Sequence, residues 1–442
     1  MRISKIAKKA VALLVLLSLC VLVEYGIGQA LTPVSYADYF KHDIESLLNE
    51  DENADMIFIG ASRTYRSFVP EIFEERLGLE NVINAGSSSQ PYSASYYQLK
   101  DLLKVFTPEY VVLGVTGDKL VTEESTQGKL IVYDRLINAG TKISFGINCL
   151  EGKEKLYLLR SYRFREDLAL STIRANRMEK EQLVEDEYEP DKSGSEYYAD
   201  KGFVYSYNTF EVGNIPVTGE SDFSKENIIE KNVEWLDKVV DLCEKEGIEL
   251  YLVAGPTTMM RLYNIENYQD AEDFYKAYAE KNDISYYNLN LLRSREELFP
   301  DSLMHDYNHV NGEGAEVISR QYADILKNQM NGEDSTDLFY SSFEELKDGV
   351  ERIVAVSADI ETKNGKIILK IKSLQSNDVI PEYQVQMAVD GGEYALISGY
   401  SRETDYVIEI PEESQIKIRI DARNSEKISE AGAFQVYEYD FR

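Results

Sequence analysis

Apolar positions along the middle of the chain recur with two different periods, and the two patterns alternate. Short apolar runs predict five strands, at residues 56–60, 82–84, 110–115, 249–254 and 285–289. Apolar residues three and four apart predict helices at residues 36–48, 69–77, 93–106, 227–245, 268–280 and 314–327. Strands that alternate with helices form a parallel sheet with helices on its faces, so this part of the chain is predicted to have an α/β fold.

The alternation stops between residues 119 and 225, which we interpret as an insertion within an α/β domain spanning residues 32–330. The insertion contains a predicted helix at residues 156–178 and an acidic stretch rich in tyrosine: Tyr188, Tyr197, Tyr198, Tyr205 and Tyr207. An insertion at the carboxyl edge of a parallel sheet lies where ligands bind, so it is a candidate lid or substrate platform. The tyrosines either stack on sugar rings or pack the insertion onto the sheet, and the sequence leaves both readings open.

A different pattern begins after a polar segment at residues 331–349, which we interpret as a linker. Polar and apolar residues then alternate over residues 366–372, 382–389, 406–410 and 415–420. Asn364-Gly365 and Asp390-Gly391-Gly392 have the composition of tight hairpin turns. Short strands without helices predict a β-sandwich over residues 350–442, of an immunoglobulin/fibronectin-like or carbohydrate-binding-like kind.

The first 31 residues differ from the rest of the chain. Basic residues precede an apolar run at residues 10–23 that contains no acidic residue, which is the pattern of a secretory signal or of an uncleaved signal anchor. We favour a single N-terminal anchor in the cell membrane, with the bulk of the chain extracellular, because basic residues keep the near side of a span in the cytoplasm. The alternatives are cleavage near Gly28-Gln29-Ala30 and lipidation of Cys20.

Composition excludes some classes of function. The 442 residues carry a net charge of −31, spread along the chain, which argues against nucleic-acid binding because phosphate contacts need clustered Lys and Arg. Three cysteines, Cys20, Cys149 and Cys243, give no zinc-site spacing, and the last two are interpreted as core thiols. The chain has no phosphate-binding loop and no paired-histidine helix motif, so no cofactor and no metal are predicted.

Two distant segments carry the residue types of a nucleophilic site. Gly60-Ala61-Ser62 follows the first predicted strand, so Ser62 is predicted on a tight turn at the carboxyl edge of the sheet. Asp306 and His309 stand three apart just before the last predicted helix. A serine hydroxyl attacks efficiently when an imidazole takes its proton and a carboxylate orients that imidazole. His305 with Asp301 is a competing pair for the same role.

These segments resemble the blocks of the SGNH, or GDSL-like, hydrolase superfamily, which follow one another in a fixed order along an α/β domain. Gly60 to Ser62 stands at the first block, Gly86 at the second, and Asp306 to His309 at the fifth. At the third block the family has an asparagine, whereas this chain has Thr116-Gly117-Asp118. The resemblance covers roughly residues 50 to 330 and points to a membrane-anchored branch associated with O-acetylation of cell-surface polysaccharides.

The resemblance implies a nucleophile at Ser62, a general base at His309 and an orienting acid at Asp306. It also implies an oxyanion hole formed by the backbone amides of Ser62 and Gly86. Thr116, Asn84 or Ser88 are the candidates for the missing third donor. The candidate substrate-binding side chains are Arg63, Tyr197 and Tyr198, with a salt bridge as the alternative for Arg63.

On this basis the expected function is acyl transfer through an acyl-Ser62 intermediate, by an O-acetyltransferase or an acetylesterase. The expected partners are an extracellular polysaccharide or cell-wall polymer and, by resemblance, a membrane-bound O-acyltransferase. The alternative is a non-catalytic glycan-binding or assembly protein whose site has decayed, for which the absent third-block asparagine is the evidence.

Overall fold

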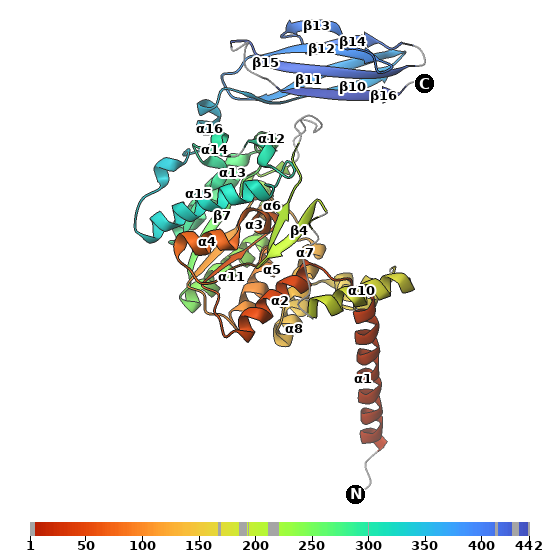
Figure 1. Ribbon diagram of the computed structural model, residues 1–442, viewed down its shortest axis with the longest axis vertical. Coiled ribbons are helices and arrows are strands. Elements are labelled where there is room, and N and C mark those ends of the chain that lie inside the picture. The colour runs from red at the N-terminus through yellow and green to blue at the C-terminus, as the bar shows by residue number, and fades with distance from the viewer. Residues whose placement is uncertain are drawn as a thin grey trace.

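A computed structural model describes residues 5–166, 169–184, 192, 194–210, 221–298, 300–411, 414–426 and 433–440. Figure 1 shows three parts stacked along the long axis: a protruding N-terminal helix, an α/β body, and a layered β-structure at the C-terminal end. The predicted α/β fold with a C-terminal β-sandwich is confirmed.

The body is built on one five-stranded parallel sheet, in the order β2-β1-β3-β7-β9. Its strands are β1 (Met56–Ile59), β2 (Val82–Asn84), β3 (Tyr110–Gly114), β7 (Glu249–Ala254) and β9 (Ser285–Asn288). Strand β1 pairs with β2 on one side and with β3 on the other, so it lies inside the sheet. The chain order reverses between β1 and β3, and in open parallel sheets this switch point is where ligands bind, beyond the carboxyl ends of the strands.

Helices cover both faces of the sheet because its strands are apolar on both sides. Ile57, Ile59, Val111 and Leu113 point into one core, with residues of α2 (Tyr36–Asn49), α5 (Tyr92–Leu102), α11 (Glu230–Glu246) and α13 (Tyr268–Lys281). Met56, Phe58 and Val112 point into the other, with α4 (Pro70–Leu77) and α15 (Gly312–Met330). Cys149 and Cys243 are free and buried, as expected for core thiols.

The insertion contains more helix than the sequence pattern indicated. Its helical elements are α6 (Gly117–Val121), α7 (Thr126–Arg135), α8 (Ala139–Asn148), η1 (Gly152–Leu158), α9 (Arg160–Arg163) and α10 (Leu170–Val184). The single helix predicted at residues 156–178 is therefore wrong, because the chain turns between η1, α9 and α10. A hairpin of β4 (Glu196–Asp200) and β5 (Phe203–Ser206) follows, and Tyr188 lies outside the described residues.

Shorter elements complete the body and its link to the C-terminal part. They are α3 (Ser62–Ser67), β6 (Ser221–Asp222), η2 (Lys225–Asn227), α12 (Met259–Asn264), β8 (Ile265–Glu266), η3 (Leu289–Leu291), α14 (Arg295–Leu298), η4 (Asp301–Leu303), η5 (Thr336–Leu338) and α16 (Phe343–Gly349). Phe343 and Leu346 of α16 are buried against Met259 and Leu262 of α12. The segment predicted as a linker is thus packed onto the body.

Two antiparallel sheets form the C-terminal sandwich, in the orders β10-β11-β14 and β13-β12-β15-β16. The strands are β10 (Ile353–Lys363), β11 (Lys366–Gln375), β12 (Pro381–Val389), β13 (Ala395–Ser401), β14 (Asp405–Glu409), β15 (Gln415–Asn424) and β16 (Phe434–Asp440). The residues Asn364, Gly365, Asp390 and Gly391 all have positive φ, which confirms the two predicted hairpin turns.

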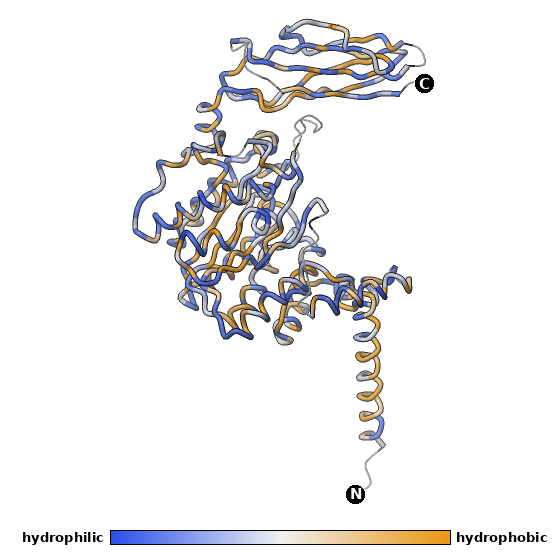
Figure 2. Tube along the Cα trace, viewed as in Figure 1, coloured by the Kyte–Doolittle hydropathy of each residue, from blue (hydrophilic) through white to orange (hydrophobic). Residues whose placement is uncertain are grey.

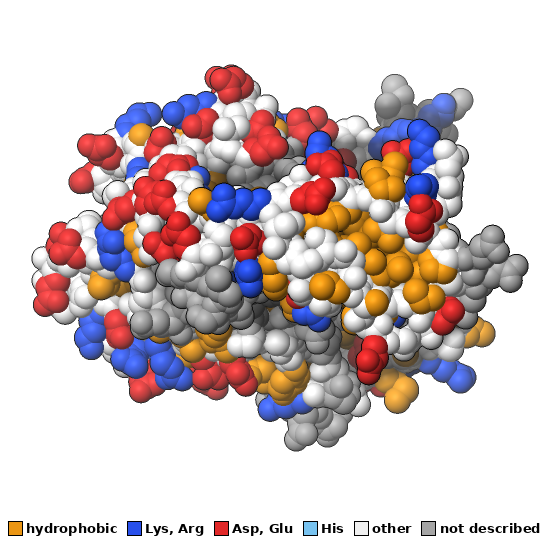
Figure 3. All heavy atoms as spheres, turned by 90° about the horizontal axis from the view of Figure 1, so that it is seen from above, with side chains coloured by type: hydrophobic (Ala, Val, Ile, Leu, Met, Phe, Trp, Pro, Cys, Tyr) orange, Lys and Arg blue, Asp and Glu red, His pale blue; other side chains and the backbone are white. Residues whose placement is uncertain are grey.

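Seen from above, acidic and basic side chains lie side by side over much of the surface, and hydrophobic side chains gather in one area (Figure 3).

Helix α1 (Lys5–Leu31) is apolar along most of its length (Figure 2). Its exposed large apolar side chains include Val11, Leu13, Leu14, Val15, Leu16, Leu19, Val21, Leu22 and Val23. The stretch Ala7–Leu31 is long and apolar enough to cross a membrane, judged by length and composition. Its last turns contact the body: the Ser161 amide and hydroxyl donate to the Glu24 carboxylate, and Asn176 donates to the Leu31 carbonyl.

Helix α3 lies unusually close to the ends of three neighbouring strands. A Cβ atom at Gly60, Gly86 or Gly114 would lie within 3.0 Å of the Thr64 side chain, at distances of 2.5, 3.0 and 2.1 Å. Gly60 also has φ of +150°, which residues with a side chain rarely adopt. Thr64 is 1% exposed. It occupies a space between Gly60, Gly86 and Gly114 that stays open because these residues have no side chain, and we call this space the Thr64 seat.

We therefore expect Gly114→Ala to destabilise the body by about 1–3 kcal/mol, because the new methyl group overpacks the Thr64 hydroxyl. The measurement is urea unfolding followed by the fluorescence of Trp235, the one tryptophan of the chain, which lies on the buried face of α11. Gly399→Ala is the matched control, since nothing lies within 4 Å of its Cβ position.

Adding Thr64→Ala should recover part of the loss, because a Cβ at Gly114 lies 3.4 Å from the Thr64 Cβ, an ordinary contact. Strictly additive losses in the double variant would contradict the proposed seat.

Candidate active site

Ser62 begins helix α3 immediately beyond strand β1. Ile59 ends the strand, Gly60 and Ala61 make the turn, and Ser62 is the first helical residue. The turn is tied to the next loop, because the Ser87 amide donates to the Gly60 carbonyl (3.0 Å). The serine hydroxyl is therefore held at the carboxyl edge of the sheet, beside the switch point.

Asp306 and His309 lie in a closed loop between η4 and α15. Met304 and Val310 form an antiparallel bridge across the base of the loop, and the His305 amide donates to the His309 carbonyl (2.8 Å). Asn311 caps α15 by accepting from the Gly314 amide (2.9 Å), and its own amide donates to Ser302 (3.0 Å). These bonds fix the conformation of the loop independently of the contacts made by the Asp306 and His309 side chains.

The structure brings Ser62, His309 and Asp306 together. The His309 Nε2 atom is 2.7 Å from the Ser62 Oγ, and its Nδ1 atom is 2.9 Å from both Asp306 carboxylate oxygens. The Asp306 carboxylate also accepts the backbone amides of Asn308 (2.7 Å) and His309 (2.9 Å). The carboxylate therefore holds Nδ1 as the protonated nitrogen and leaves Nε2 free to accept from the serine hydroxyl.

The electrostatics of the loop favour a neutral imidazole. Burial lowers the pKa of His309 most strongly; the Asp306 carboxylate opposes this, and the cations Arg63 and Arg66 add to it. Burial raises the pKa of Asp306, but its bonds to His309 and to backbone amides outweigh that and bring the pKa to about 2. At neutral pH the pair is a carboxylate and a neutral histidine, which is the state a general base requires.

The competing histidine, His305, faces another way. Its Nδ1 atom lies 2.6 Å from the hydroxyl of Ser206 on β5, and its Nε2 atom is 3.7 Å from Asp306. The structure joins His309, and not His305, to Ser62 among the described residues.

The predicted oxyanion donors differ in whether they already have a hydrogen-bond partner. Ser62 opens a helix, so its amide is one of the N-terminal groups that lack a partner within the helix. The Gly86 amide lies against the start of α3 but donates to the Asn84 side-chain oxygen (3.1 Å). Asn84 itself uses both amide hydrogens on the carbonyls of Thr64 (3.0 Å) and Phe68 (2.8 Å), so it is not a free third donor. Thr116 immediately precedes α6, and its role as the third donor stays a prediction. Ser88 is exposed.

The third-block position contributes an acid instead of an asparagine. Asp118 lies 3.1 Å from Arg261 and 3.8 Å from Arg63, and Arg63 also approaches the Asn308 side chain (3.4 Å). Arg261 in turn donates to the Tyr307 hydroxyl (3.2 Å), next to the catalytic loop. Asp118 and its two arginines thus brace the loop of Asp306 from the side. Sequence reasoning missed Arg261, since nothing in its surroundings marks it.

The tyrosines of the insertion divide into two groups. Tyr198 is 2% exposed, contacts Tyr36 and Tyr39, and donates to the Asp43 carboxylate, so its ring offers no free face to a ligand. On the other face of the hairpin, Tyr197 stacks on Tyr205 with ring centroids 5.5 Å apart, and Tyr207 joins them. Tyr205 lies against Gly312, and Ser206 contacts His305, so this cluster borders the loop of His309.

The sequence matches no protein-family model and no curated protein. Among solved structures, the chain is similar to a protein assigned to the lipolytic G-D-S-L family from Desulfitobacterium hafniense, with 11% identity and a TM-score of 0.32, over 62% of this chain and 100% of the other. It is similar to a GDSL-like lipase from Bacteroides thetaiotaomicron, with 11% identity and a TM-score of 0.30, over 66% and 100%.

It is also similar to a two-domain esterase active on acetylated mannans, with 12% identity and a TM-score of 0.28, over 90% of this chain and 93% of the other. Likeness of this degree carries no argument about activity, which rests on the chain's own residues.

Proposed function

We propose that this chain is a serine-dependent acyl-transfer enzyme of the SGNH type. The observation that carries the proposal is the continuous chain of contacts from Ser62 Oγ through His309 to Asp306, at 2.7 and 2.9 Å. A serine at a strand end, a neutral imidazole and an ionised carboxylate in this order are the parts of a nucleophilic acyl transfer.

In the first half-reaction, Ser62 Oγ attacks the ester carbonyl while its proton passes to His309 Nε2. The bond from the acyl carbon to the leaving alcohol then breaks, and His309 returns the proton to that alcohol. Acyl-Ser62 remains. In the second half-reaction His309 takes a proton from an acceptor hydroxyl, whose oxygen attacks the acyl carbon. The bond from that carbon to Ser62 Oγ then breaks, and His309 returns the proton to Ser62 Oγ.

The proposed donors to the oxyanion are the amides of Ser62 and Gly86, with the Gly86 amide exchanging its bond to Asn84 for one to the oxyanion. Such donors lower a barrier by roughly 3–4 kcal/mol in favourable cases. Because the third-block asparagine is absent, we expect a modest rate unless Thr116 or the substrate itself supplies a further donor.

The proposed acceptor and substrate class is an extracellular polysaccharide carrying O-acetyl groups. The feature that favours it is the cluster of Tyr197, Tyr205 and Tyr207 beside the His309 loop, because tyrosine rings present flat apolar faces with a polar rim. Tyr207 is 49% exposed and therefore accessible. An acetylesterase and an O-acetyltransferase share every step above and differ only in whether water or a sugar hydroxyl attacks acyl-Ser62.

The proposed location is the cell membrane, with α1 as an uncleaved anchor and the body outside. The support is that the exposed apolar stretch of α1 runs without interruption into turns bound to the body through Glu24 and Leu31. Cleavage near residues 28–30 would cut within these turns.

Ser62→Ala and His309→Ala should each lower the rate of 4-nitrophenyl acetate cleavage by at least about a thousandfold, with the double variant no worse, because the two groups act as one unit. Asp306→Asn should keep a residual rate, since this residue only orients the base. His305→Ala is the matched control and should retain most activity. A wild-type rate no higher than that of Ser62→Ala and of buffer alone would favour the alternative of a glycan-binding protein with a decayed site.

The pH dependence of kcat/KM should show an acidic limb with its midpoint below 6.5, because burial lowers the pKa of His309 and only the neutral imidazole accepts the serine proton. Arg63→Met should move this midpoint to higher pH, since it removes a cation that disfavours imidazolium. Arg76→Met, which alters a surface ion pair with Asp324, should leave it in place. A shift to lower pH in Arg63→Met would contradict the assignment of His309.

After expression with its native N-terminus, the chain should stay in the membrane fraction under alkaline carbonate extraction and keep residues 1–31. N-terminal sequencing of the extracted protein checks this. A soluble mature form that begins near residue 31 would show that the segment is a cleaved signal.

A further inference from the structure

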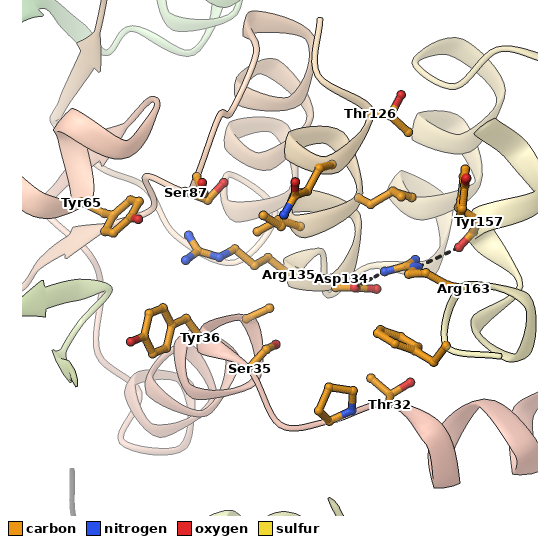
Figure 4. Close-up of a pocket in the computed structure, with 17 residues that line it drawn as sticks. Thr32, Ser35, Tyr36, Tyr65, Ser87, Thr126, Asp134, Arg135, Tyr157 and Arg163 are labelled. Carbon is orange, nitrogen blue, oxygen red and sulfur yellow. Dashed lines mark hydrogen bonds and ion pairs between the residues drawn. The ribbon is translucent and has the colours of Figure 1, made fainter. Parts of the chain in front are cut away.

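A cavity of about 650 Å³ lies beside the candidate active site, between α2, α7 and the loop after β2. Its volume falls in the range of pockets that enclose small organic molecules. Figure 4 shows its walls: Tyr65 and Ser87 at one end, Thr32, Tyr157 and Arg163 at the other, and Arg135 between them.

One end of the cavity adjoins the site. Tyr65 stands one turn after Ser62 on α3, and Ser87 and Ser88 directly follow Gly86. Arg135, from α7, donates to the carbonyls of Ala85 (3.3 Å) and Gly86 (2.6 Å). Whatever occupies this end therefore contacts the loop that carries a proposed oxyanion donor.

The other end adjoins the point where α1 meets the body. Thr32 and Pro33, which line the cavity, are the first residues after the apolar helix ends at Leu31. Phe164 closes the same end, next to α9, which packs against the last turns of α1. A cavity in this position opens beside the residues that would emerge from a bilayer.

The walls combine apolar surface with charged groups, as in an amphiphile site, and the lining acid Asp134 is ion-paired with Arg160 and Arg163. Leu130, Ile131 and Phe164 supply apolar surface, whereas Arg135 supplies a cation that is 4% exposed. Among the described residues no carboxylate lies within ion-pair distance of Arg135, and its buried Nε atom has no hydrogen-bond partner. Its electrostatic neighbours are Tyr198, Tyr65 and Asp43, and Tyr198 donates to Asp43. A buried arginine without a counter-ion favours an anionic ligand.

We propose that this cavity binds one anionic lipid from the membrane, with the headgroup oxygens at Arg135 and the alkyl chain along Ile131 and Phe164 toward Thr32. The proposal goes beyond the acyl-transfer function and does not depend on Ser62 chemistry. It rests on a cavity that joins the end of the apolar helix to an unpaired buried cation. Arg135 also donates to the carbonyls of Ala85 and Gly86. A lipid bound at Arg135 therefore influences the position of the loop that carries the proposed oxyanion donor Gly86.

The test is native mass spectrometry of the full chain in a neutral maltoside detergent, in the Ser62→Ala background so that no turnover occurs. The probes are dodecyl phosphate, dodecanol and inorganic phosphate. We expect one dodecyl phosphate to be retained per chain, with dodecanol and inorganic phosphate each retained at least about tenfold less.

Ile131→Trp should fill the cavity, and Arg135→Met should remove the cation, each lowering the retained fraction about tenfold. Ile147→Trp is the matched control, because Ile147 is exposed on α8 and does not line the cavity. Should Arg135→Met fail to fold, Ile131→Trp decides alone.

Equal retention in Ile131→Trp and Ile147→Trp would overturn the proposal, as would retention of dodecanol equal to that of dodecyl phosphate. Binding of inorganic phosphate as tight as that of dodecyl phosphate would show a plain anion site and would equally overturn it. Loss of esterase activity in Ser62-containing protein affects none of these readouts.

Discussion

The arrangement of the site depends on how closely one short helix can approach a parallel sheet. Thr64 lies within a seat formed by glycines at or just beyond the ends of three strands, Gly60, Gly86 and Gly114, where any side chain would collide with it. This contact fixes the first turn of α3, and with it the position of Ser62 and of the amides around it. Asn84 adds two hydrogen bonds from below, to the carbonyls of Thr64 and Phe68. The nucleophile is thereby placed by backbone packing and not by its own interactions.

The position of His309 is set by a different group of contacts from those that place Ser62. The two residues meet only when the chain is folded. A bridge between Met304 and Val310 closes the loop of Asp306 and His309, and Asn311 joins that loop to α15. Asp118 and the arginines beside it support the loop from the insertion side. Arg63, one of the two arginines that brace the loop, also disfavours imidazolium, so structural support and the protonation state of the base are linked through this residue.

The sequence was enough to predict the sheet, because the strands are short apolar runs separated by periodic helices, and β2 and β7 have the predicted bounds. It also indicated Ser62, Asp306 and His309, since their spacing around a strand end and a helix start is local. The seat around Thr64 was not predictable, because the close approach of a helix to three strand ends leaves only isolated glycines in the sequence. Most helices of the insertion were missed for a related reason: their apolar faces pack against distant elements and show no clear period of their own. The sequence left open whether Tyr198 binds a ligand or packs, and the structure buries it.

If the account is correct, the hydroxyl of Ser62 is activated by the His309 imidazole. A fluorophosphonate probe measures this directly, because it forms a stable adduct with an activated serine without requiring knowledge of the natural substrate. Incubation of the full chain with the probe at neutral pH, followed by peptide mapping, should yield a single adduct on Ser62 that is absent from His309→Ala. An adduct on another serine, or labelling of Ser62 that is unchanged without His309, would contradict the account.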